Sequence, residues 1–365
     1  MFINAFFIFI LVVIFFFNKD PFKGIKLIIV RTRYMQNNII NFKILFICCF
    51  IGFVSSLNAQ YLKGITNVRD TSYATASAFK KTLKYYPNCR MVPEMHFDFV
   101  KQKNDVVYCS YGKRKMKLDV FFDKNAKKKQ TAIIIIHGGG WRSGNRQQHH
   151  PMAQKLASLG YVCFTPEYRL STEALFPAAI YDVKAAIRWV RKNAAKYNVD
   201  PNQIVSLGFS AGGEMAAFMG TTGNMPLFEG VMTNSNSQSQ VNAVVDIDGT
   251  LSFVHPEGGE GDDSKNISAG TYWFGYSKKE NPKLWEAASP LSYVSASTPP
   301  TLFINSSVAR MHAGRDDYRK VLDANGIYSE VHEFENSPHS FCLFNPWFDP
   351  TIQYIDGFLK KVFKK

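Results

Sequence analysis

The sequence predicts an α/β fold with a mostly parallel central sheet and helices on both faces. From about residue 106 onward, short apolar runs rich in β-branched residues alternate with runs of helical periodicity, which is the pattern of a parallel sheet covered on both sides. With 365 residues, of which 46% are hydrophobic and 20% charged, the chain can bury a large core. No internal repeat or low-complexity tract interrupts this pattern.

The first 59 residues read as a targeting region. Two apolar runs, 2–17 and 44–57, open the chain, and the second has the order of a secretory signal: Met35, a polar stretch with Lys43, an apolar core and small residues up to Ala59. We therefore expect a signal peptide over 35–59 and a secreted or periplasmic protein. Translation is then expected to start at Met35, with 1–34 an upstream extension; the alternative is a membrane anchor at 2–17.

The remaining elements follow in order. An N-terminal extension is expected over 60–93, with a helical patch, before a main domain over 94–365. Strands are predicted at 106–110, 117–122, 131–136, 161–166, 204–208, 241–247, 300–304 and 328–334. Helices are predicted at 74–86, 151–159, 178–197, from 211 onward and at 352–363. The segment 250–290, rich in Gly, Asp, Ser and aromatic residues, is expected to be an insertion over the functional site.

Charge and cysteine content exclude several classes of protein. Of the formal net charge of +14, five units lie in the first 59 residues, and the rest is spread along the chain. The densest basic run, 124–129, has no interleaved aromatic residues or nucleic-acid motif, so we expect no nucleic-acid partner. Six cysteines without zinc-site spacing predict neither a metal site nor a disulfide scaffold. No cofactor is expected.

The strongest motif is Gly208-Phe209-Ser210-Ala211-Gly212, between an apolar strand and a helix. A serine hydroxyl becomes a nucleophile when a base takes its proton, and it must stand clear of the sheet to meet a carbonyl group. A tight strand-to-helix turn exposes it in this way but crowds the backbone, so glycine is needed on both sides. The motif predicts that Ser210 is a nucleophile.

A glycine-rich loop follows the buried strand that ends at Ile136. Its sequence is His137-Gly-Gly-Gly-Trp141, and three glycines let backbone N–H groups turn toward an oxyanion. His339, in Asn336-Ser-Pro-His-Ser-Phe341 after the last strand, is the histidine placed to reach Ser210 from the same sheet edge. His149 and His150 are expected at the solvated start of a helix.

Together these motifs resemble the α/β-hydrolase fold, and specifically the hormone-sensitive-lipase-like esterases. The resemblance covers roughly 116–364 and includes Glu167-Tyr-Arg-Leu170, Phe176-Pro-Ala-Ala179 with Asp182, and Asp200-Pro-Asn-Gln-Ile204. It implies that the N–H groups of Gly139, Gly140 and Ala211 form the oxyanion hole. The segments 273–275 and 346–348 further resemble secreted bacterial carbohydrate esterases, which implies acetyl or feruloyl esters of carbohydrate as substrates.

The sequence departs from this family at the catalytic acid. Many members carry an aspartate a few residues after the strand at 301–305, but here the turn reads Ser306-Ser-Val-Ala-Arg310. Asp316 and Asp317 come later, at a helix start, where capping the helix is an alternative role. Asp248, at the end of the preceding strand, is our choice for the acid, because some lipases and dehalogenases of this fold place theirs there; Asp246 lies on the same face of that strand but deeper.

The predicted function is that of a serine carboxylesterase acting on a small-molecule or carbohydrate ester through an acyl-enzyme. Two alternatives remain open: a serine peptidase of the same fold, and a carbohydrate-binding protein that has lost catalysis. A membrane partner is expected only if residues 2–17 are a retained anchor.

Overall fold

The computed structural model describes residues 65–223, 225–230 and 237–364, all within one unit, Leu57–Lys365. The predicted signal peptide at 35–59, the possible anchor at 2–17 and the rest of segment 1–34 lie outside the described residues. No helix in the described ranges has both the length and the apolar character of a membrane span.

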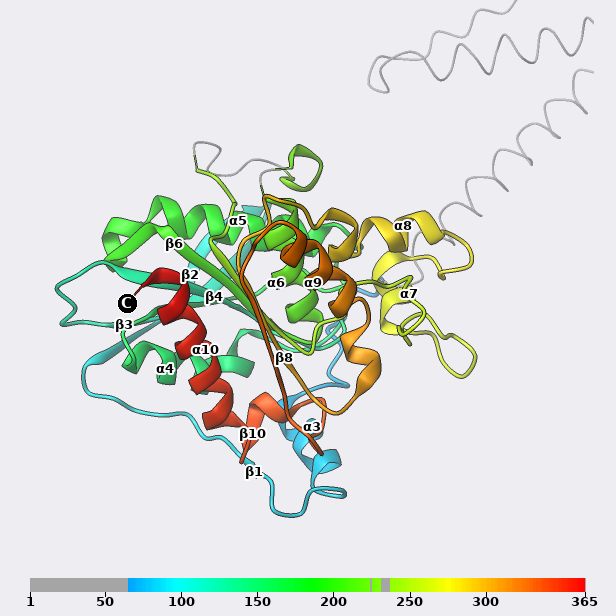
Figure 1. The fold of residues 1–365 in the computed structure, drawn as a ribbon, viewed down its shortest axis with the longest axis horizontal. Helices are drawn as coiled ribbons and strands as arrows, with labels where there is room; N and C mark the ends of the chain where they lie inside the picture. Colours follow the sequence, from blue (N-terminus) through cyan, green and yellow to red (C-terminus); the bar gives the residue numbers. More distant parts are fainter. Residues whose placement is uncertain (1–64, 224, 231–236, 365) are drawn as a thin grey trace, which may run out of the picture. The chain divides into compact units, whose positions relative to one another are not determined.

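A single eight-stranded sheet organises the molecule (Figure 1). Its spatial order is β2-β3-β5-β4-β6-β7-β8-β9; β2, β3 and β5 pair antiparallel, and all pairs from β5 to β9 are parallel. The strands are β2 Val100–Tyr111, β3 Arg114–Asp123, β4 Gln130–Ile136, β5 Val162–Pro166, β6 Val199–Phe209, β7 Ala243–Ile247, β8 Thr301–Asn305 and β9 Ser329–Glu333. The predicted mostly parallel sheet is confirmed. β2 begins six residues earlier than expected because its first half is exposed and polar, which hides the strand pattern.

The apolar run in β4 shows why these strands lie at the centre. Ile134 and Ile136 pack into the core on one face of the sheet, and Ile133 and Ile135 pack into the core on the other. Because successive side chains of a strand point to opposite faces, only a strand covered on both sides can be apolar at every position.

Helices cover both faces, as predicted (Figure 1). α5, α6 and α9 contribute to one core, and α4 and α10 to the other. The helices are α3 Thr75–Thr82, α4 His150–Ser158, α5 Ala178–Lys192, α6 Ala211–Thr222, α7 Ala269–Phe274, α8 Pro282–Ala287, α9 Arg315–Ala324 and α10 Phe348–Phe363. α10 begins four residues earlier than predicted, because Pro350 is tolerated in the first turn of a helix.

The described part of the N-terminal extension packs onto the main domain. β1 (Arg90–Met91) pairs antiparallel with β10 (Phe344–Asn345), and Phe79 of α3 contacts the ring of Phe344. The predicted insertion at 250–290 contains the short helices α7 and α8.

The expectation that His149 and His150 are solvated is wrong. Their exposed fractions are 1% and 4%, because both imidazole rings pack against buried aromatic side chains. His150 Nε2 lies 3.0 Å from Asp119 Oδ2, and the ring of His149 meets the ring of Phe209 edge to face.

Candidate active site

Ser210 occupies the turn between β6 and α6 and has a backbone conformation that residues other than glycine rarely adopt. Its φ and ψ are 57° and −122°, and such strain is typical of functional positions. The flanking glycines allow the turn: a Cβ on Gly208 would lie 1.9 Å from the carbonyl oxygen of Gly212, and one on Gly212 would lie 2.1 Å from that of Ile136. The turn therefore requires the glycines that the sequence motif contains.

His339 and Asp248 meet Ser210 in one hydrogen-bonded chain. His339 Nε2 lies 2.8 Å from Ser210 Oγ, and His339 Nδ1 lies 2.8 Å from Asp248 Oδ2. Asp248 follows β7, and His339 lies in the loop between β9 and β10. The parallel strands β6 and β7 end at the same edge of the sheet, so residues distant in the sequence converge there.

The turn after β8 holds Asp248 in place. Asp248 is fully buried, and its Oδ1 accepts a hydrogen bond of 2.7 Å from the backbone N–H of Ser306, while the Ser306 hydroxyl donates to Oδ2. The family position that lacks a carboxylate in this chain therefore supplies two donors to a carboxylate on the neighbouring strand.

The two alternative acids lie elsewhere. Asp316 pairs with Arg315, and Asp317 contacts His255 and Lys320. Asp246, deeper in β7, accepts a hydrogen bond of 2.8 Å from the N–H of Gly249. Burial raises the pKa of Asp246 well above its usual range, which favours its neutral form.

The glycine-rich loop lies beside the serine turn. Gly139 and Gly140 have φ of 125° and 59°, which favour glycine. The N–H groups of Gly139, Gly140 and Ala211 have no hydrogen-bond partner among the residues that the structure describes. By contrast, the N–H of Gly138 donates to Gln148 Oε1 at 2.8 Å, which fixes the start of the loop.

A hollow of about 160 Å³ opens beside Ser210, and Gly140, Ala211 and His339 form part of its wall. Trp141 stacks on Trp273 of α7 at 4.6 Å between ring centroids, so the insertion at 250–290 contributes to the site as expected.

Sequence reasoning missed three supporting residues. These are Ser306, which donates to Asp248; Gln148, which holds Gly138; and Glu214, whose Oε2 accepts a hydrogen bond of 2.9 Å from Trp141 Nε1. Each is a single polar residue without a motif, so no local signal identifies it. The departure of the 306–310 turn from the family pattern was the one available hint.

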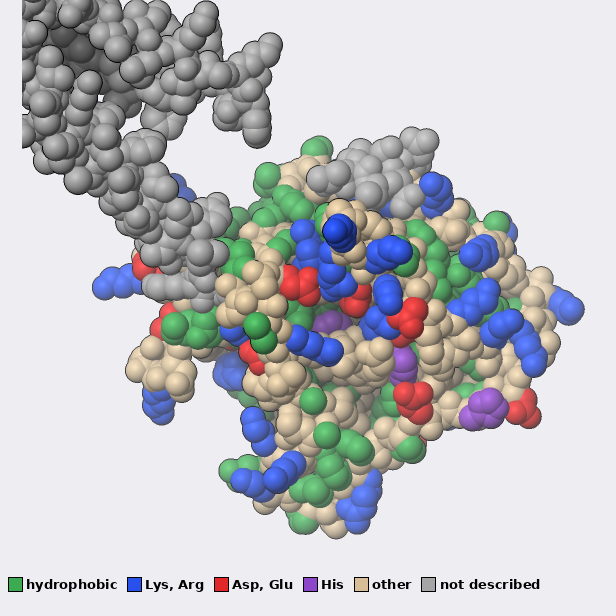
Figure 2. Space-filling model, turned by 180° about the vertical axis from the view of Figure 1, so that it is seen from behind, with side chains coloured by type: hydrophobic (Ala, Val, Ile, Leu, Met, Phe, Trp, Pro, Cys, Tyr) green, Lys and Arg blue, Asp and Glu red, His purple; other side chains and the backbone are tan. Residues whose placement is uncertain are grey.

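Among the described residues, no group of three or more His, Cys, Asp or Glu side chains is placed to hold a metal ion. On the face shown in Figure 2, Lys and Arg side chains are interspersed with Asp and Glu rather than gathered into one basic stripe.

Comparisons with known proteins point to esterases. A family model described as BD-FAE matches residues 118–310, more than half of the chain. The chain is 28% identical over 262 residues to the esterase LipQ of Mycobacterium tuberculosis, covering 70% of this chain and 61% of LipQ. It is 32% identical over 200 residues to the esterase LipC of the same organism, covering 52% of this chain and 47% of LipC. The chain thus spans about half to three-fifths of these relatives.

Two solved structures share the fold over most of the described chain. One is a truncated form of a carbohydrate esterase from gut microbiota, with a TM-score of 0.62, 26% identity, and coverage of 73% of this chain and 99% of that one. The other is esterase 2 of Thermogutta terrifontis with propionate bound, with a TM-score of 0.59, 26% identity, and coverage of 76% and 97%.

Proposed function

The chain belongs to the BD-FAE family, and from this premise we propose that it is a carboxylic ester hydrolase that removes short acyl groups from carbohydrate. Ser210 is the nucleophile, His339 the general base and acid, and Asp248 the residue that orients the imidazole. The observation that carries this proposal is the unbroken hydrogen-bonded chain from Ser210 Oγ through both ring nitrogens of His339 to Asp248.

In the first half of the reaction, Ser210 Oγ attacks the ester carbonyl carbon while His339 Nε2 takes the hydroxyl proton. The negative charge of Asp248 stabilises the imidazolium that forms. The carbonyl oxygen becomes an oxyanion, which the N–H groups of Gly139, Gly140 and Ala211 bind. The bond to the sugar oxygen then breaks, His339 donates its proton to that oxygen, and an acyl-serine remains.

In the second half, a water molecule attacks the acyl-serine and gives a proton to His339. The bond between the acyl carbon and Ser210 Oγ breaks, the acid leaves, and His339 returns the proton to Ser210. Two protein-based proton transfers balance each half, so the scheme needs no cofactor.

The size of the hollow supports a short acyl group. About 160 Å³ beside Ser210 is small against the 300–1,000 Å³ of typical ligand pockets. We therefore propose acetyl esters as the first candidate substrates and feruloyl esters as the second. The gut-microbiota protein that shares this fold is a carbohydrate esterase, and a sugar is the alcohol that we propose for the ester cleaved by this chain.

The proposal is tested by kinetics of the full chain on p-nitrophenyl acetate, p-nitrophenyl octanoate and methyl ferulate. Ser210→Ala is expected to lower kcat about 10⁶-fold with the fold retained, while Ser292→Ala, an exposed serine outside the site, keeps full activity. Cleavage of p-nitroanilides in place of esters would support the peptidase alternative. A folded protein that cleaves neither would support the carbohydrate-binding alternative.

We also propose that the protein is exported to a secreted or periplasmic location through the segment 35–59. The cysteines at 89, 109, 163 and 342 are free and buried, and burial would protect these thiols in an oxidising compartment. N-terminal sequencing of the native protein is expected to begin at Gln60. A first residue before Met35 would overturn both the start site and the cleavage.

A further inference from the structure

A second cavity, of about 420 Å³, lies at the edge of the sheet where β4 and β5 end. Its wall includes His137 and Gly144 of the loop after β4 and Glu167 directly after β5, and Arg69 of the N-terminal extension closes one side. Gly144 packs against Gly139, since a Cβ on Gly139 would lie 3.1 Å from its nitrogen. The cavity thus lies next to the glycine-rich loop of the active site.

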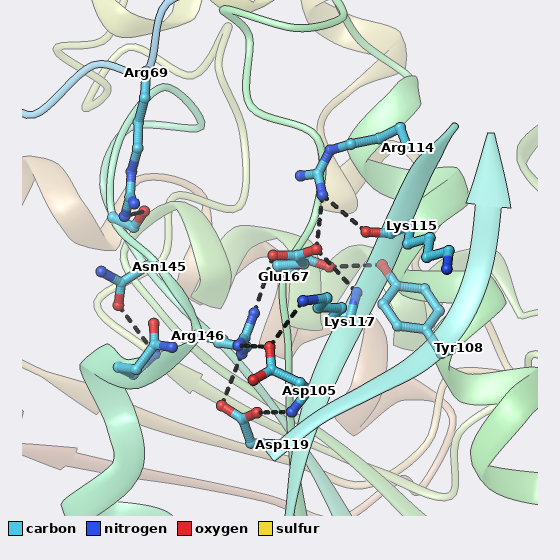
Figure 3. Close-up of polar contacts among 12 residues, drawn as sticks. Arg69, Asp105, Tyr108, Arg114, Lys115, Lys117, Asp119, Asn145, Arg146 and Glu167 are labelled. Atoms are coloured by element: carbon cyan, nitrogen blue, oxygen red, sulfur yellow. Dashed lines mark hydrogen bonds and ion pairs between the residues drawn. The ribbon is translucent and has the colours of Figure 1, made fainter. Parts of the chain in front are cut away.

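Part of the cavity wall is a network of ion pairs in which Arg114 and Arg146 both bind Glu167. Glu167 Oε1 accepts hydrogen bonds from Arg114 Nη1 and from the N–H of Lys117, both at 2.9 Å, and its Oε2 accepts from Arg146 Nη1 at 3.2 Å (Figure 3). Arg146 also pairs with the fully buried Asp119 at 2.8 Å. The charges within this network are compensated, whereas Arg69, also in the wall, has no carboxylate partner among the described residues.

His137 adds an acceptor that no other group in the described part of the chain uses. It is 2% exposed, stacks on Tyr168 at 4.3 Å between ring centroids, and has Nδ1 2.9 Å from the carbonyl oxygen of Gly138. That carbonyl can only accept, so Nδ1 carries the proton and Nε2 has a free lone pair. Nε2 has no hydrogen-bond partner among the described residues. Burial lowers the pKa of His137 to about 4, so the ring is neutral at pH 7.

The same cavity contains donors with spare capacity. Arg69 donates from Nη2 to the carbonyl oxygen of Gly144 at 3.3 Å, and its other N–H groups have no acceptor among the described residues. The side-chain amide of Gln147 has no partner within the described ranges. Figure 3 shows Arg69 and Asn145 across from Arg114 and Glu167. A neutral acceptor beside planar donors with unused N–H groups matches a ligand whose hydroxyl groups both donate and accept.

We propose that this cavity is a subsite for an uncharged sugar unit of the carbohydrate whose ester is cleaved at Ser210. The inference rests on the proposed function for its substrate, and on the cavity for the place where the sugar binds. Ile136 at the end of β4 pairs with Gly208 near the end of β6, so His137 and Ser210 follow neighbouring strands about 4.8 Å apart. His137 lines the cavity, and Gly140 and Trp141 of the same loop line the hollow beside Ser210, so a saccharide that occupied both would pass along this loop.

The first experiment compares two substrates with the full chain. Arg69→Ala and, separately, Gln147→Ala are expected to lower the ratio of kcat/KM on acetylated xylotriose to kcat/KM on p-nitrophenyl acetate about tenfold, through a higher KM for the sugar ester. The matched control is Arg90→Ala, an exposed arginine that also bonds only to backbone carbonyl groups, and it leaves the ratio unchanged. An unchanged ratio in both cavity variants would overturn the subsite.

The second experiment measures binding without turnover. Calorimetric titration of the full-length Ser210→Ala variant with xylotriose, mannotriose, cellotriose and trigalacturonate is expected to show binding of at least one neutral trisaccharide, tighter than that of trigalacturonate, and weakened about tenfold by Arg69→Ala. Absence of neutral-sugar binding, or tighter binding of the charged sugar, refutes the inference. Because this assay does not need catalysis, it separates failure of the subsite from failure of the proposed esterase.

Discussion

Replacement of Asp248 by Asn is expected to lower kcat/KM on p-nitrophenyl acetate about 10⁴-fold while the protein stays folded. The side chain keeps its shape, but an NH₂ group replaces one acceptor oxygen. If the NH₂ takes the place of Oδ1, it faces the N–H of Ser306, which is 2.7 Å from that oxygen. If it takes the place of Oδ2, it faces His339 Nδ1, which is 2.8 Å away.

The second orientation is favoured because the backbone N–H of Ser306 can only donate, whereas the Ser306 hydroxyl, which donates to Oδ2, can turn and accept from the NH₂ group. The NH₂ group then donates to Nδ1, and the proton of the imidazole moves to Nε2. In that tautomer Nε2 cannot take the proton of Ser210. A similar replacement in a serine protease lowers kcat about 10⁴-fold, which corresponds to about 5 kcal/mol of lost transition-state stabilisation.

The assay compares Asp248→Asn with Asp316→Asn and Asp317→Asn under the same conditions, with circular dichroism and thermal unfolding to confirm the fold. The last two are expected to stay within about twofold of the wild type, because their carboxylates pair with Arg315 and Lys320 rather than His339. A folded Asp248→Asn variant within tenfold of wild-type activity, or a larger loss in Asp317→Asn, would refute the assignment.

Three further predictions concern the surroundings of the site. Ser306→Ala removes the hydroxyl that donates to Asp248 and is expected to lower kcat/KM on p-nitrophenyl acetate about 10- to 100-fold; an unchanged rate would show that the backbone donor suffices. Gly212→Ala places a Cβ 2.1 Å from a backbone oxygen and is expected to cost about 2–3 kcal/mol in denaturant unfolding; an unaltered midpoint would contradict the close packing. Burial raises the pKa of Glu214 well above its usual range, so its effect on stability is favourable below the unfolded-state pKa, near 4.3, and declines as the pH rises toward the folded-state pKa. The difference in melting temperature between Glu214→Gln and the wild type is therefore expected to shift in favour of the variant from pH 4 to pH 8. An equal difference at both pH values would show that the pKa of Glu214 is the same in the folded and the unfolded protein.

The fold could be predicted from local patterns because the strands that build it are buried on both faces. The run 132–136 contributes side chains to both cores, and such a run has few structural explanations other than a central strand. Prediction was weaker where the chain is solvated, as in the first half of β2, because exposed strands tolerate polar residues on both faces.

For the site, the sequence by itself determined the serine turn, the glycine-rich loop and the choice of histidine. Steric crowding at Ser210 demands glycines within two residues, so the signal is local and visible. Only the tertiary structure decided that Asp248, 91 residues before His339 in the chain, is the carboxylate that reaches it. Likewise, only the tertiary structure showed that Arg69 and His137 line one cavity. Contacts between distant segments depend on how strand ends and loops are arranged in space, and no short stretch of sequence encodes that arrangement.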